Sequence, residues 1–377
     1  MEQLFEGIVI GFASLSYKNI VMFLIGFLLI YLAIKKDYEP MLLLPIGFGA
    51  ILVNIPFSSV LNFEGAPGVL KILFDAGIET ELFPVLIFIA IGAMIDFTPL
   101  FRSPVMIFFG AAAQFGIFST LIVAALIFDD LELASAIGII GAADGPTAIF
   151  VGAKFAKDHF AAISVAAYSY MALVPIIQPP VIRLFTTKEE RLIRMDYKEV
   201  KVSKTVKIIF PIAVTIIAGL VAPISVPLVG LLMFGNLIRE SGVLERLSKA
   251  AQNELANLVT ILLGITIGST MLAENFLRLD TLYILLLGLL AFVFDTAGGV
   301  LFAKLVNLFV KNKINPMIGA AGISAFPMSA RVIHKMAQKE DPSNFILMQA
   351  VSANVSGQLG SIVAGGLVLK LVPLLLG

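Results

Sequence analysis

ASAIGIIGAADGPTAIFVGAKFAK, residues 134–157, decides how this sequence is interpreted. The stretch is long and apolar enough to cross a bilayer, which takes about 20 mostly apolar residues. Asp144 stands in its middle, where a carboxylate costs about 2.5–3.5 kcal/mol on insertion scales. Pro146 has no N–H and clashes with the preceding turn, so a straight helix is disfavoured. We therefore predict two half-helices, 134–143 and 146–157, with Asp144 at the break.

The break leaves two roles open for Asp144. Broken helices expose carbonyls and helix ends at membrane depth, which is tolerated where they line a site. Ionisable residues inside membranes also default to function. Thr147 follows three residues later, at the position of an N-cap partner. The alternative is that Asp144 only caps the second half-helix.

The composition supports a membrane protein. The chain has 377 residues, of which 59% are hydrophobic and 14% charged, whereas soluble domains carry about 25% charged residues. A net charge of zero gives no electrostatic footprint for nucleic acid. The absence of cysteine excludes disulfides and thiolate metal sites, and two histidines make a polyhistidine site improbable. We predict an all-α, polytopic membrane protein.

The hydropathy pattern divides the chain into about eleven apolar segments, each a candidate span. They are 19–35, 40–58, 84–101, 104–128, 134–157, 160–185, 207–235, 256–275, 280–311, 315–334 and 345–376. Pro223 and Pro227 are expected to divide the seventh segment if it is two elements.

Loop charges orient the chain. The segment 183–207 holds eight Lys and Arg residues against four acidic ones, so it is expected to be cytoplasmic. The segments 59–83 and 129–132 lean acidic and are expected outside. If every segment crossed the membrane fully, some loops would violate the positive-inside rule. At least one segment is therefore expected to be broken or re-entrant. The number of crossings stays open.

Three matched blocks in the same order indicate an internal repeat. GAADGPTAIF at 141–150 pairs with GAAGISAFPM at 319–328, FST at 118–120 pairs with FDT at 294–296, and IAIGAMI at 89–95 pairs loosely with LGITIGS at 263–269. Transporters built from two repeats place their site where the repeats meet. We predict the following units, with the repeats inverted: 1–35, an interfacial segment (1–16) and first span; 36–185, the first repeat; 186–206, a basic cytoplasmic linker; and 207–377, the second repeat.

The second half offers a matching interrupted segment, NPMIGAAGISAFPMSAR at 315–331. Asn315 precedes a proline, a good helix start. Asn315 and Ser324 would lie on opposite faces of an ideal helix, so convergence on one site requires a break near Gly322. Ser324 and Arg331, seven residues apart, would share a face. The alternatives are close helix packing for the glycines and a snorkelling role for Arg331.

Two further polar clusters lie in apolar segments. VSANVSGQLGS at 351–361 has too many amides and hydroxyls for a lipid-facing helix, although interhelical hydrogen bonding alone would explain them. Tyr168 and Tyr170 lie in AAYSYMALVP, and tyrosines near span ends often only line the interface. One carboxylate with amides, hydroxyls and carbonyls suits a hard, monovalent cation, either Na⁺ or a proton.

DGPTAIF at 144–150 and NPMIGAAGISAFPMSAR at 315–331 resemble the signature segments of the β subunit of sodium-pumping, biotin-dependent decarboxylases. That family serves oxaloacetate, methylmalonyl-CoA, glutaconyl-CoA and malonate decarboxylases, and the resemblance covers essentially the whole chain. It implies a membrane subunit that decarboxylates carboxybiotin, consumes a proton and exports Na⁺.

The resemblance also implies roles for individual residues. Asp144 is the expected Na⁺ carboxylate, and the same ion pathway includes Asn315, Gly319, Ser324 and Asn354. Three residues are expected to be catalytic: Tyr170 and Ser324 as possible proton relays, and Arg331 as the group that holds the carboxylate of carboxybiotin.

The resemblance finally implies an assembly. No biotinyl-lysine motif of the Ala-Met-Lys-Met kind occurs, so biotin is expected on another subunit. The expected partners are biotin-carrier and carboxyltransferase subunits, a small membrane-anchor subunit, further copies of the chain and membrane lipid, in the cytoplasmic membrane of a bacterium or archaeon. Two rivals fit the residues without the resemblance: a Na⁺-coupled secondary transporter without chemistry, and a structural anchor.

Overall fold

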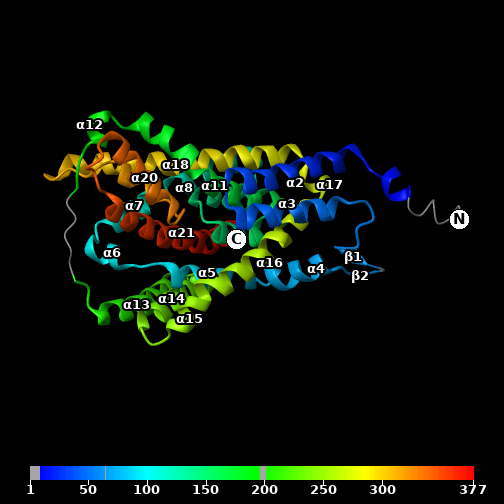
Figure 1. Cartoon of the computed structure of the whole chain (residues 1–377), viewed down its shortest axis with the longest axis horizontal. Helices are drawn as coiled ribbons and strands as arrows, with labels where there is room; N and C mark the ends of the chain where they lie inside the picture. Colours follow the sequence, from blue (N-terminus) through cyan, green and yellow to red (C-terminus); the bar gives the residue numbers. More distant parts are fainter. Residues whose placement is uncertain (1–8, 64, 196–200) are drawn as a thin grey trace.

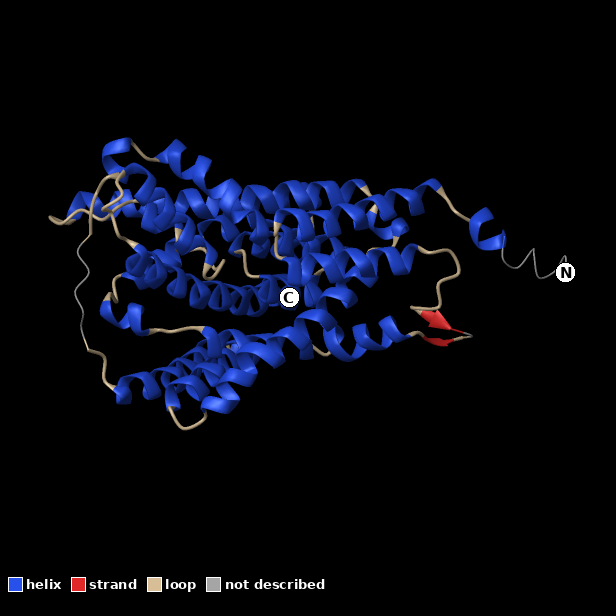
Figure 2. Cartoon of the chain, in the orientation of Figure 1, coloured by secondary structure: helices blue, strands red, loops and turns tan. Residues whose placement is uncertain are grey.

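The computed structural model describes residues 9–63, 65–195 and 201–377. The described chain is almost entirely helical, with one short hairpin of two strands (Figure 2). The all-α, polytopic membrane fold is therefore confirmed. Residues 1–8 of the expected interfacial segment lie outside the described part, and residues 9–13 form a helix separated from the first span.

The elements of the first half end at the linker. They are α2 (Tyr17–Lys36), α3 (Pro40–Asn54), β1 (Asn62–Phe63), β2 (Ala66–Pro67), α4 (Val69–Phe74), η1 (Asp75–Glu79), α5 (Leu82–Met94), α6 (Thr98–Arg102), α7 (Met106–Ala112), α8 (Phe115–Phe128), α9 (Leu131–Gly138), η2 (Ile139–Ala142), α10 (Gly145–Phe155), η3 (Lys157–His159), α11 (Phe160–Phe185) and α12 (Lys188–Arg191). The strands β1 and β2 are antiparallel, with Asn62 opposite Pro67.

The second half begins after the linker. Its elements are α13 (Lys204–Val221), η4 (Pro223–Ser225), α14 (Val226–Ser241), α15 (Glu245–Ala250), η5 (Ala251–Leu255), α16 (Ala256–Ser269), α17 (Ala273–Phe276), α18 (Leu279–Phe309), α19 (Met317–Ala320), α20 (Met328–Glu340) and α21 (Leu347–Leu376). The segments η2, η3 and η4 are 3-10 turns, and η1 and η5 are π-helical turns within longer helices.

Eight helices of the described residues are long and apolar enough to cross a membrane. Up to nine spans result if Val69–Glu79 and Leu82–Met94, bent by 61°, count as one. The expected segment 207–235 is two helices, divided at Pro223. The segments 40–58, 134–157 and 315–334 instead hold short or interrupted helices. Broken elements were expected at the last two, and the structure has them there.

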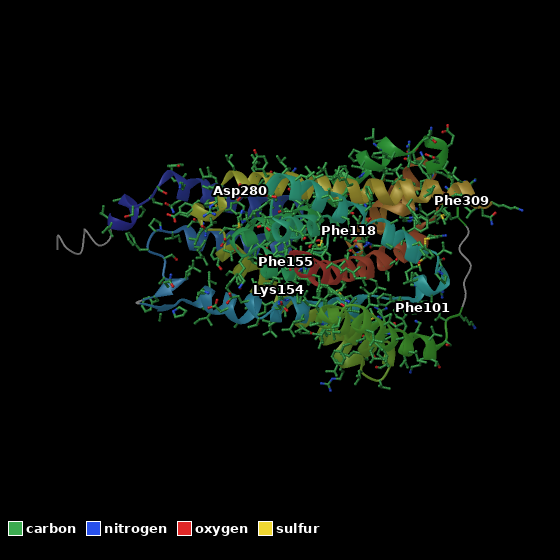
Figure 3. All side chains as sticks on the ribbon, turned by 180° about the vertical axis from the view of Figure 1, so that it is seen from behind. Phe101, Phe118, Lys154, Phe155, Asp280 and Phe309 are labelled. Carbon is green, nitrogen blue, oxygen red and sulfur yellow. The ribbon has the colours of Figure 1, made fainter. Side chains whose placement is uncertain are left out.

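The helices pack in a recurring set of pairs. α2 packs on α3 and α13 on α14; α3 packs on α16 and α14 on α5; α11 packs on α18 and α21 on α7. α12, in the first part of the linker, lies at one end of the long axis, and the β1–β2 hairpin lies at the other (Figure 1). That the basic linker is cytoplasmic and the acidic segment 59–83 lies outside stays a prediction. Seen from behind, Asp280 and Phe309 mark the two ends of α18 (Figure 3).

Candidate functional site at two interrupted helices

The first interruption contains Asp144. α9 tightens into the 3-10 turn η2, Ala143 takes a left-handed conformation (φ 52°), and Asp144 is extended (φ −124°, ψ 94°) before α10 begins. Pro146 lies in the first turn of α10, where its missing N–H removes no helical hydrogen bond. The predicted pair of half-helices is confirmed, with Asp144 at the N-cap position of the second.

The carboxylate of Asp144 is buried (3% exposed) and accepts hydrogen bonds from three neutral side chains. All three reach the same oxygen, Oδ2. The Thr147 hydroxyl lies 2.5 Å away, the Ser361 hydroxyl 3.0 Å and the Gln358 amide nitrogen 3.1 Å. Two of these donors come from α21, so the Asp144 carboxylate joins distant elements. Although Asp144 stands at the N-cap position of α10, its side chain makes no capping hydrogen bond.

The second interruption meets the first. α19 ends at Ala320, and α20 begins at Met328, so the chain between them is non-helical around Gly322, where a break was the condition for convergence on one site. The backbone N–H of Ser324 donates to the carbonyl of Ala142 over 3.0 Å. The Ser324 hydroxyl donates to the carbonyl of Gly357 in α21 over 2.9 Å. Ser324 is therefore bonded to a residue that stands only two positions before Asp144.

One face of α21 runs past both interruptions. Asn354, Gln358 and Ser361 are spaced i, i+4 and i+7, which places them on one helical face. The Asn354 amide nitrogen donates to the carbonyl of Ile323 over 2.6 Å, and its Oδ1 is buried without a hydrogen-bond partner. An unpaired buried oxygen is costly, so Asn354 offers a vacant acceptor beside the second interruption.

Asn315 lies at the start of the second interrupted segment, where its partners belong to the basic linker. Its amide nitrogen donates to the carbonyls of Arg191 and Ile193, both over 2.9 Å. Its Oδ1 accepts the N–H of Met317 over 3.1 Å. Within the described residues, no hydrogen bond joins Asn315 to Asp144, so the structure brings Ser324 and Asn354 to the two interruptions and leaves Asn315 at the linker.

The linker is held to α20 by ion pairs as well. Arg191 binds Glu340 over 2.7 Å, and Arg194 binds Asp341 over 2.6 Å. The backbone N–H of Ser343, together with Arg194, lowers the pKa of the Asp341 carboxyl. These contacts fix residues 186–195 against the segment that carries the second interruption.

Gly319 is placed by packing. A Cβ added there would lie 1.9 Å from the carbonyl oxygen of Gly299 in α18, so only glycine permits this approach of α19 to α18. Close helix packing, the alternative to a role in the ion pathway, therefore accounts for the surroundings of Gly319.

The two tyrosines of α11 are both buried, so neither lines the membrane interface. The Tyr170 hydroxyl donates to the carbonyl of Leu285 in α18. The ring of Tyr168 packs against Gly145, next to Asp144; a Cβ added at Gly145 would lie 2.2 Å from that ring. The Tyr168 hydroxyl has no hydrogen-bond partner.

Arg331 is exposed on α20, whereas Ser324 is buried. The expectation that these two residues share a helical face is wrong, because Ser324 precedes α20 and lies in non-helical chain. Arg331 therefore faces the surface while Ser324 faces α21.

Three contributors to the site, Thr147, Gln358 and Ser361, were not assigned to it from the sequence. Thr147 was noted as a cap partner, and the other two belong to the polar cluster 351–361. The available signal was the i, i+4, i+7 spacing of Asn354, Gln358 and Ser361 in an apolar helix.

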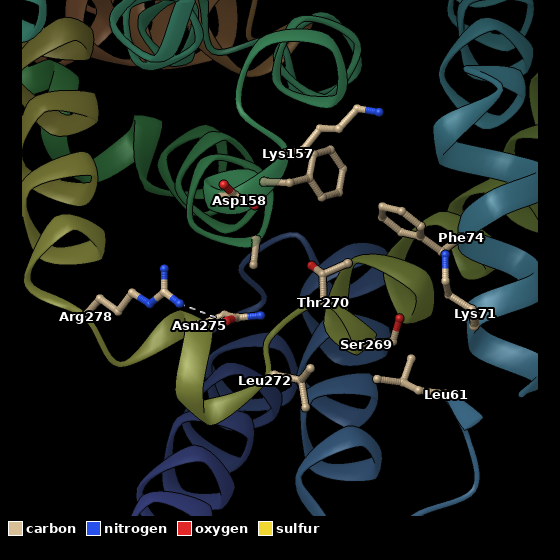
Figure 4. A pocket seen from close by; sticks show the side chains of 12 residues that line it. Leu61, Lys71, Phe74, Lys157, Asp158, Ser269, Thr270, Leu272, Asn275 and Arg278 are labelled. Atoms are coloured by element: carbon tan, nitrogen blue, oxygen red, sulfur yellow. Dashed lines mark hydrogen bonds between the residues drawn. The ribbon is translucent and has the colours of Figure 1, made fainter. Parts of the chain in front are cut away.

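A separate polar pocket of about 490 Å³ lies near the hairpin end of the molecule, beside Leu61 and α4. Lys71, Lys157, Asp158 and Arg278 bring both signs of charge to it, and Arg278 donates to Asn275 (Figure 4). None of the expected site residues lines this pocket.

The geometry around Asp144 suits a small, hard cation. Within the described residues, no group of three or more His, Cys, Asp or Glu side chains is placed to hold a metal ion. Asp144 supplies one negative charge, and the nearby hydroxyl and amide oxygens are the neutral ligands that such ions prefer.

The comparisons with known proteins agree on one family. Residues 18–372 match the family model described as the Na⁺-transporting oxaloacetate decarboxylase β subunit. The chain is 51% identical to the glutaconyl-CoA decarboxylase β subunit of Acidaminococcus fermentans, over 96% of this chain and 95% of the relative. It is 50% identical to the methylmalonyl-CoA decarboxylase β subunit of Veillonella parvula over the same shares. It is 45% identical to the oxaloacetate decarboxylase β chain 2 of Salmonella typhi, over 96% and 97%.

Proposed function

This chain belongs to the family of β subunits of Na⁺-transporting decarboxylases, and we propose that it decarboxylates carboxybiotin, consumes a proton and couples this reaction to Na⁺ export. The observation that carries the proposal is the convergence of three side-chain donors on one oxygen of Asp144, at the break of a membrane helix. Relatives named for three different acids share 43–51% identity with this chain, which fits a step that is common to all of them.

Na⁺ is the cargo, and Asp144 is the group that neutralises it. The hydroxyls of Thr147 and Ser361 each carry lone pairs as well as a proton, so both can turn from the carboxylate toward an ion. Rotating the Gln358 amide would present its oxygen in the same way. Ser324 and the unpaired Oδ1 of Asn354 complete the proposed pathway, which also runs by Asn315 and Gly319 at the second interrupted segment.

Biotin, carried on another subunit, supplies a carboxyl group that leaves as CO₂ and a ureido nitrogen that takes up one proton. Arg331 is exposed and always charged, so its guanidinium can bind the carboxylate in two hydrogen bonds. Tyr170 or Ser324 relays the proton, and an apolar surrounding disfavours the anionic starting state. Of these residues, Ser324 is also bonded to α21, which links the proton path to the cation site.

The proposed assembly rests on the family to which the chain belongs. The chain works with biotin-carrier and carboxyltransferase subunits, a small membrane-anchor subunit and further copies of itself. Its place is the cytoplasmic membrane of a bacterium or archaeon, with the linker 186–206 on the cytoplasmic side.

We also propose that 36–185 and 207–377 are inverted repeats. Exchanging the halves maps the packing of α3 with α16 onto that of α14 with α5, and the packing of α11 with α18 onto that of α21 with α7. The two interrupted segments then correspond, and the Ser324–Ala142 contact lies where the repeats meet.

The test measures CO₂ release from free carboxybiotin by the purified complex, with NaCl or with choline chloride. Release that requires Na⁺ and is lost in Asp144→Asn supports the proposal. Release that does not depend on Na⁺ contradicts the coupling, and Na⁺ transport without any decarboxylation would identify a secondary transporter. Asp75→Asn is the control, because that carboxylate is partly exposed and pairs only locally with Lys71.

A further inference from the structure

A second buried carboxylate lies in the middle of α18. Asp295 is 0% exposed. Its Oδ1 accepts the backbone N–H groups of Gly116, over 2.5 Å, and Ile117, over 3.2 Å, at the start of α8. Its Oδ2 is buried and has no hydrogen-bond partner. The roles proposed above make no use of this residue.

Capping accounts for only one of the two oxygens. α8 begins at Phe115 within a span that is interrupted after Ala112, and the first N–H groups of a helix have no acceptor four residues back within it. Oδ1 of Asp295 supplies an acceptor from the neighbouring helix to Gly116 and a second one to Ile117, whose N–H also donates to the carbonyl of Gln114 over 3.2 Å. An asparagine oxygen would do the same without the cost of a buried charge, so the free Oδ2 and its charge call for another explanation.

The unpaired oxygen faces the segment that leads to Asp144. A Cβ added at Gly141 would lie 2.7 Å from Oδ2 of Asp295. Gly141 belongs to η2 and precedes Asp144 by three residues. The two buried carboxylates of the described membrane segments thus flank the same short turn.

No basic group neutralises Asp295 from the elements that pack on α18. α7, α8, η2 and α19 carry no charged or titratable side chain. The remaining groups come from α9, α11 and α18 itself, and they are Glu132, Tyr168, Tyr170, Arg183, Asp280, Tyr283 and Lys304. Lys304, nine residues along α18 and therefore about 14 Å away, binds Glu190. If Asp295 were ionised, no nearby positive charge on these elements would balance it.

We propose that Asp295 is a proton-binding site whose proton is exchanged for the cation at Asp144. Two ionised carboxylates in an apolar surrounding disfavour each other. With Asp144 empty, Oδ2 of Asp295 keeps a proton; when one Na⁺ binds at Asp144, the O–H bond of Asp295 breaks and one H⁺ leaves for solvent. The net charge is unchanged by this exchange. The inference rests on the proposed binding of Na⁺ at Asp144.

The test counts protons as Na⁺ binds. Calorimetric titration of the purified complex with NaCl is run in two buffers of different ionisation enthalpy, which gives the number of protons released per Na⁺ bound. The expected value approaches one for the unmutated complex. Because linkage is reciprocal, the Na⁺ dissociation constant should then fall about tenfold for each unit by which the pH rises, over the pH range in which the proton is released.

Asp295→Asn keeps an oxygen for the N–H groups of Gly116 and Ile117 but cannot carry the proton. Na⁺ binding should persist in this variant, with proton release near zero and a dissociation constant nearly independent of pH. Asp280→Asn is the matched control, since it makes the same change near the start of the same helix, at a partly exposed carboxylate paired with His159. Its proton release should equal that of the unmutated complex.

Each result decides one question. Failure of the unmutated complex to bind Na⁺ would reject the proposed function itself. Na⁺ binding without proton release, or release that persists in Asp295→Asn, rejects the exchange alone. Loss of Na⁺ binding in a folded Asp295→Asn complex also rejects it, because Asp295 would then be a cation ligand. If Asp295→Asn fails to assemble, Asp295→Glu must keep the release with a shifted pH range, and an unshifted range contradicts the proposal.

Discussion

The backbone N–H of Ser324 donates to the carbonyl of Ala142, over 3.0 Å. This bond joins the second interruption to the first, two residues before Asp144. Because it uses backbone atoms, it fixes the relative position of the two interruptions whichever side chain stands at 324. The Ser324 hydroxyl is then free for a separate task, and its present partner is the carbonyl of Gly357.

Removing the Ser324 hydroxyl should therefore affect Na⁺ more than the fold. Ser324→Ala loses one hydrogen bond, so unfolding should become easier by about 1 kcal/mol. If the hydroxyl is a ligand, the Na⁺ affinity should fall about tenfold, equivalent to about 1.4 kcal/mol. Both quantities are measured on the purified complex, by denaturation and by calorimetry.

Ser329→Ala is the control for this change. Ser329 is buried in the neighbouring α20 and bonds to Gln178 and to the carbonyl of Ala320, so its loss should cost stability and spare Na⁺ affinity. Equal Na⁺ affinities in the two variants would show that Ser324 is no ligand.

The hydroxyls around Asp144 should contribute separately to cation binding. Thr147→Val keeps the side-chain shape, and Ser361→Ala removes the donor from α21; each should lower Na⁺ affinity about tenfold. Ser352→Ala, in the same helix and bonded to the carbonyl of Pro99, should leave it unchanged. The prediction is wrong if the Ser352 and Ser361 variants bind Na⁺ alike.

Gly319 should tolerate no side chain. The Cβ of Gly319→Ala would lie 1.9 Å from the Gly299 oxygen, and relieving such a clash typically costs about 1–3 kcal/mol. Thermal unfolding of the complex should start at a lower temperature, with Na⁺ transport reduced because α19 has moved. In Gly230→Ala the new Cβ has no atom closer than 3.5 Å, so stability should be retained, and equal stability of the two variants would exclude the packing role.

The two breaks were predictable from the sequence because their causes are local. Pro146 after a buried aspartate and the glycines and prolines of 315–331 disfavour a continuous helix without reference to other elements. The contacts of Gln358 and Ser361 with Asp144 were not predictable, since they join residues 214 and 217 positions apart. The spacing of the polar residues predicts which face of α21 they share, but it does not predict which element that face contacts.

The prediction that two residues share a helical face was wrong where the chain is not helical. Ser324 and Arg331 share a face only in an unbroken helix, and the break at Gly322 removes that condition. Asp295 was missed for another reason. An aspartate inside the apolar segment 280–311 is itself a signal, but Asp295 stands in a long helix with no proline beside it, and only the structure shows its pairing with the start of α8.

Asn315 should anchor the linker. Asn315→Ala removes the hydrogen bonds to the carbonyls of Arg191 and Ile193, so trypsin should cleave after Arg191 and Arg194 about tenfold faster, as expected for a loss of about 1–2 kcal/mol of local stability. Asn253→Ala, which loses only a bond to the carbonyl of Lys249, should leave the rate unchanged. Unchanged cleavage with weakened Na⁺ binding would make Asn315 an ion ligand and not an anchor.

Arg331 should matter for carboxybiotin more than for Na⁺. Arg331→Lys keeps the charge but loses the planar pair of donors that fits a carboxylate, so KM for free carboxybiotin should rise about tenfold while Na⁺ affinity stays the same. Lys335→Arg, one turn further along α20, adds the same donors elsewhere and should change neither. Because Arg331 is exposed and has no contact with Asp144 among the described interactions, an equal loss of both functions would mean that it acts on the fold of α20 and does not bind the carboxylate.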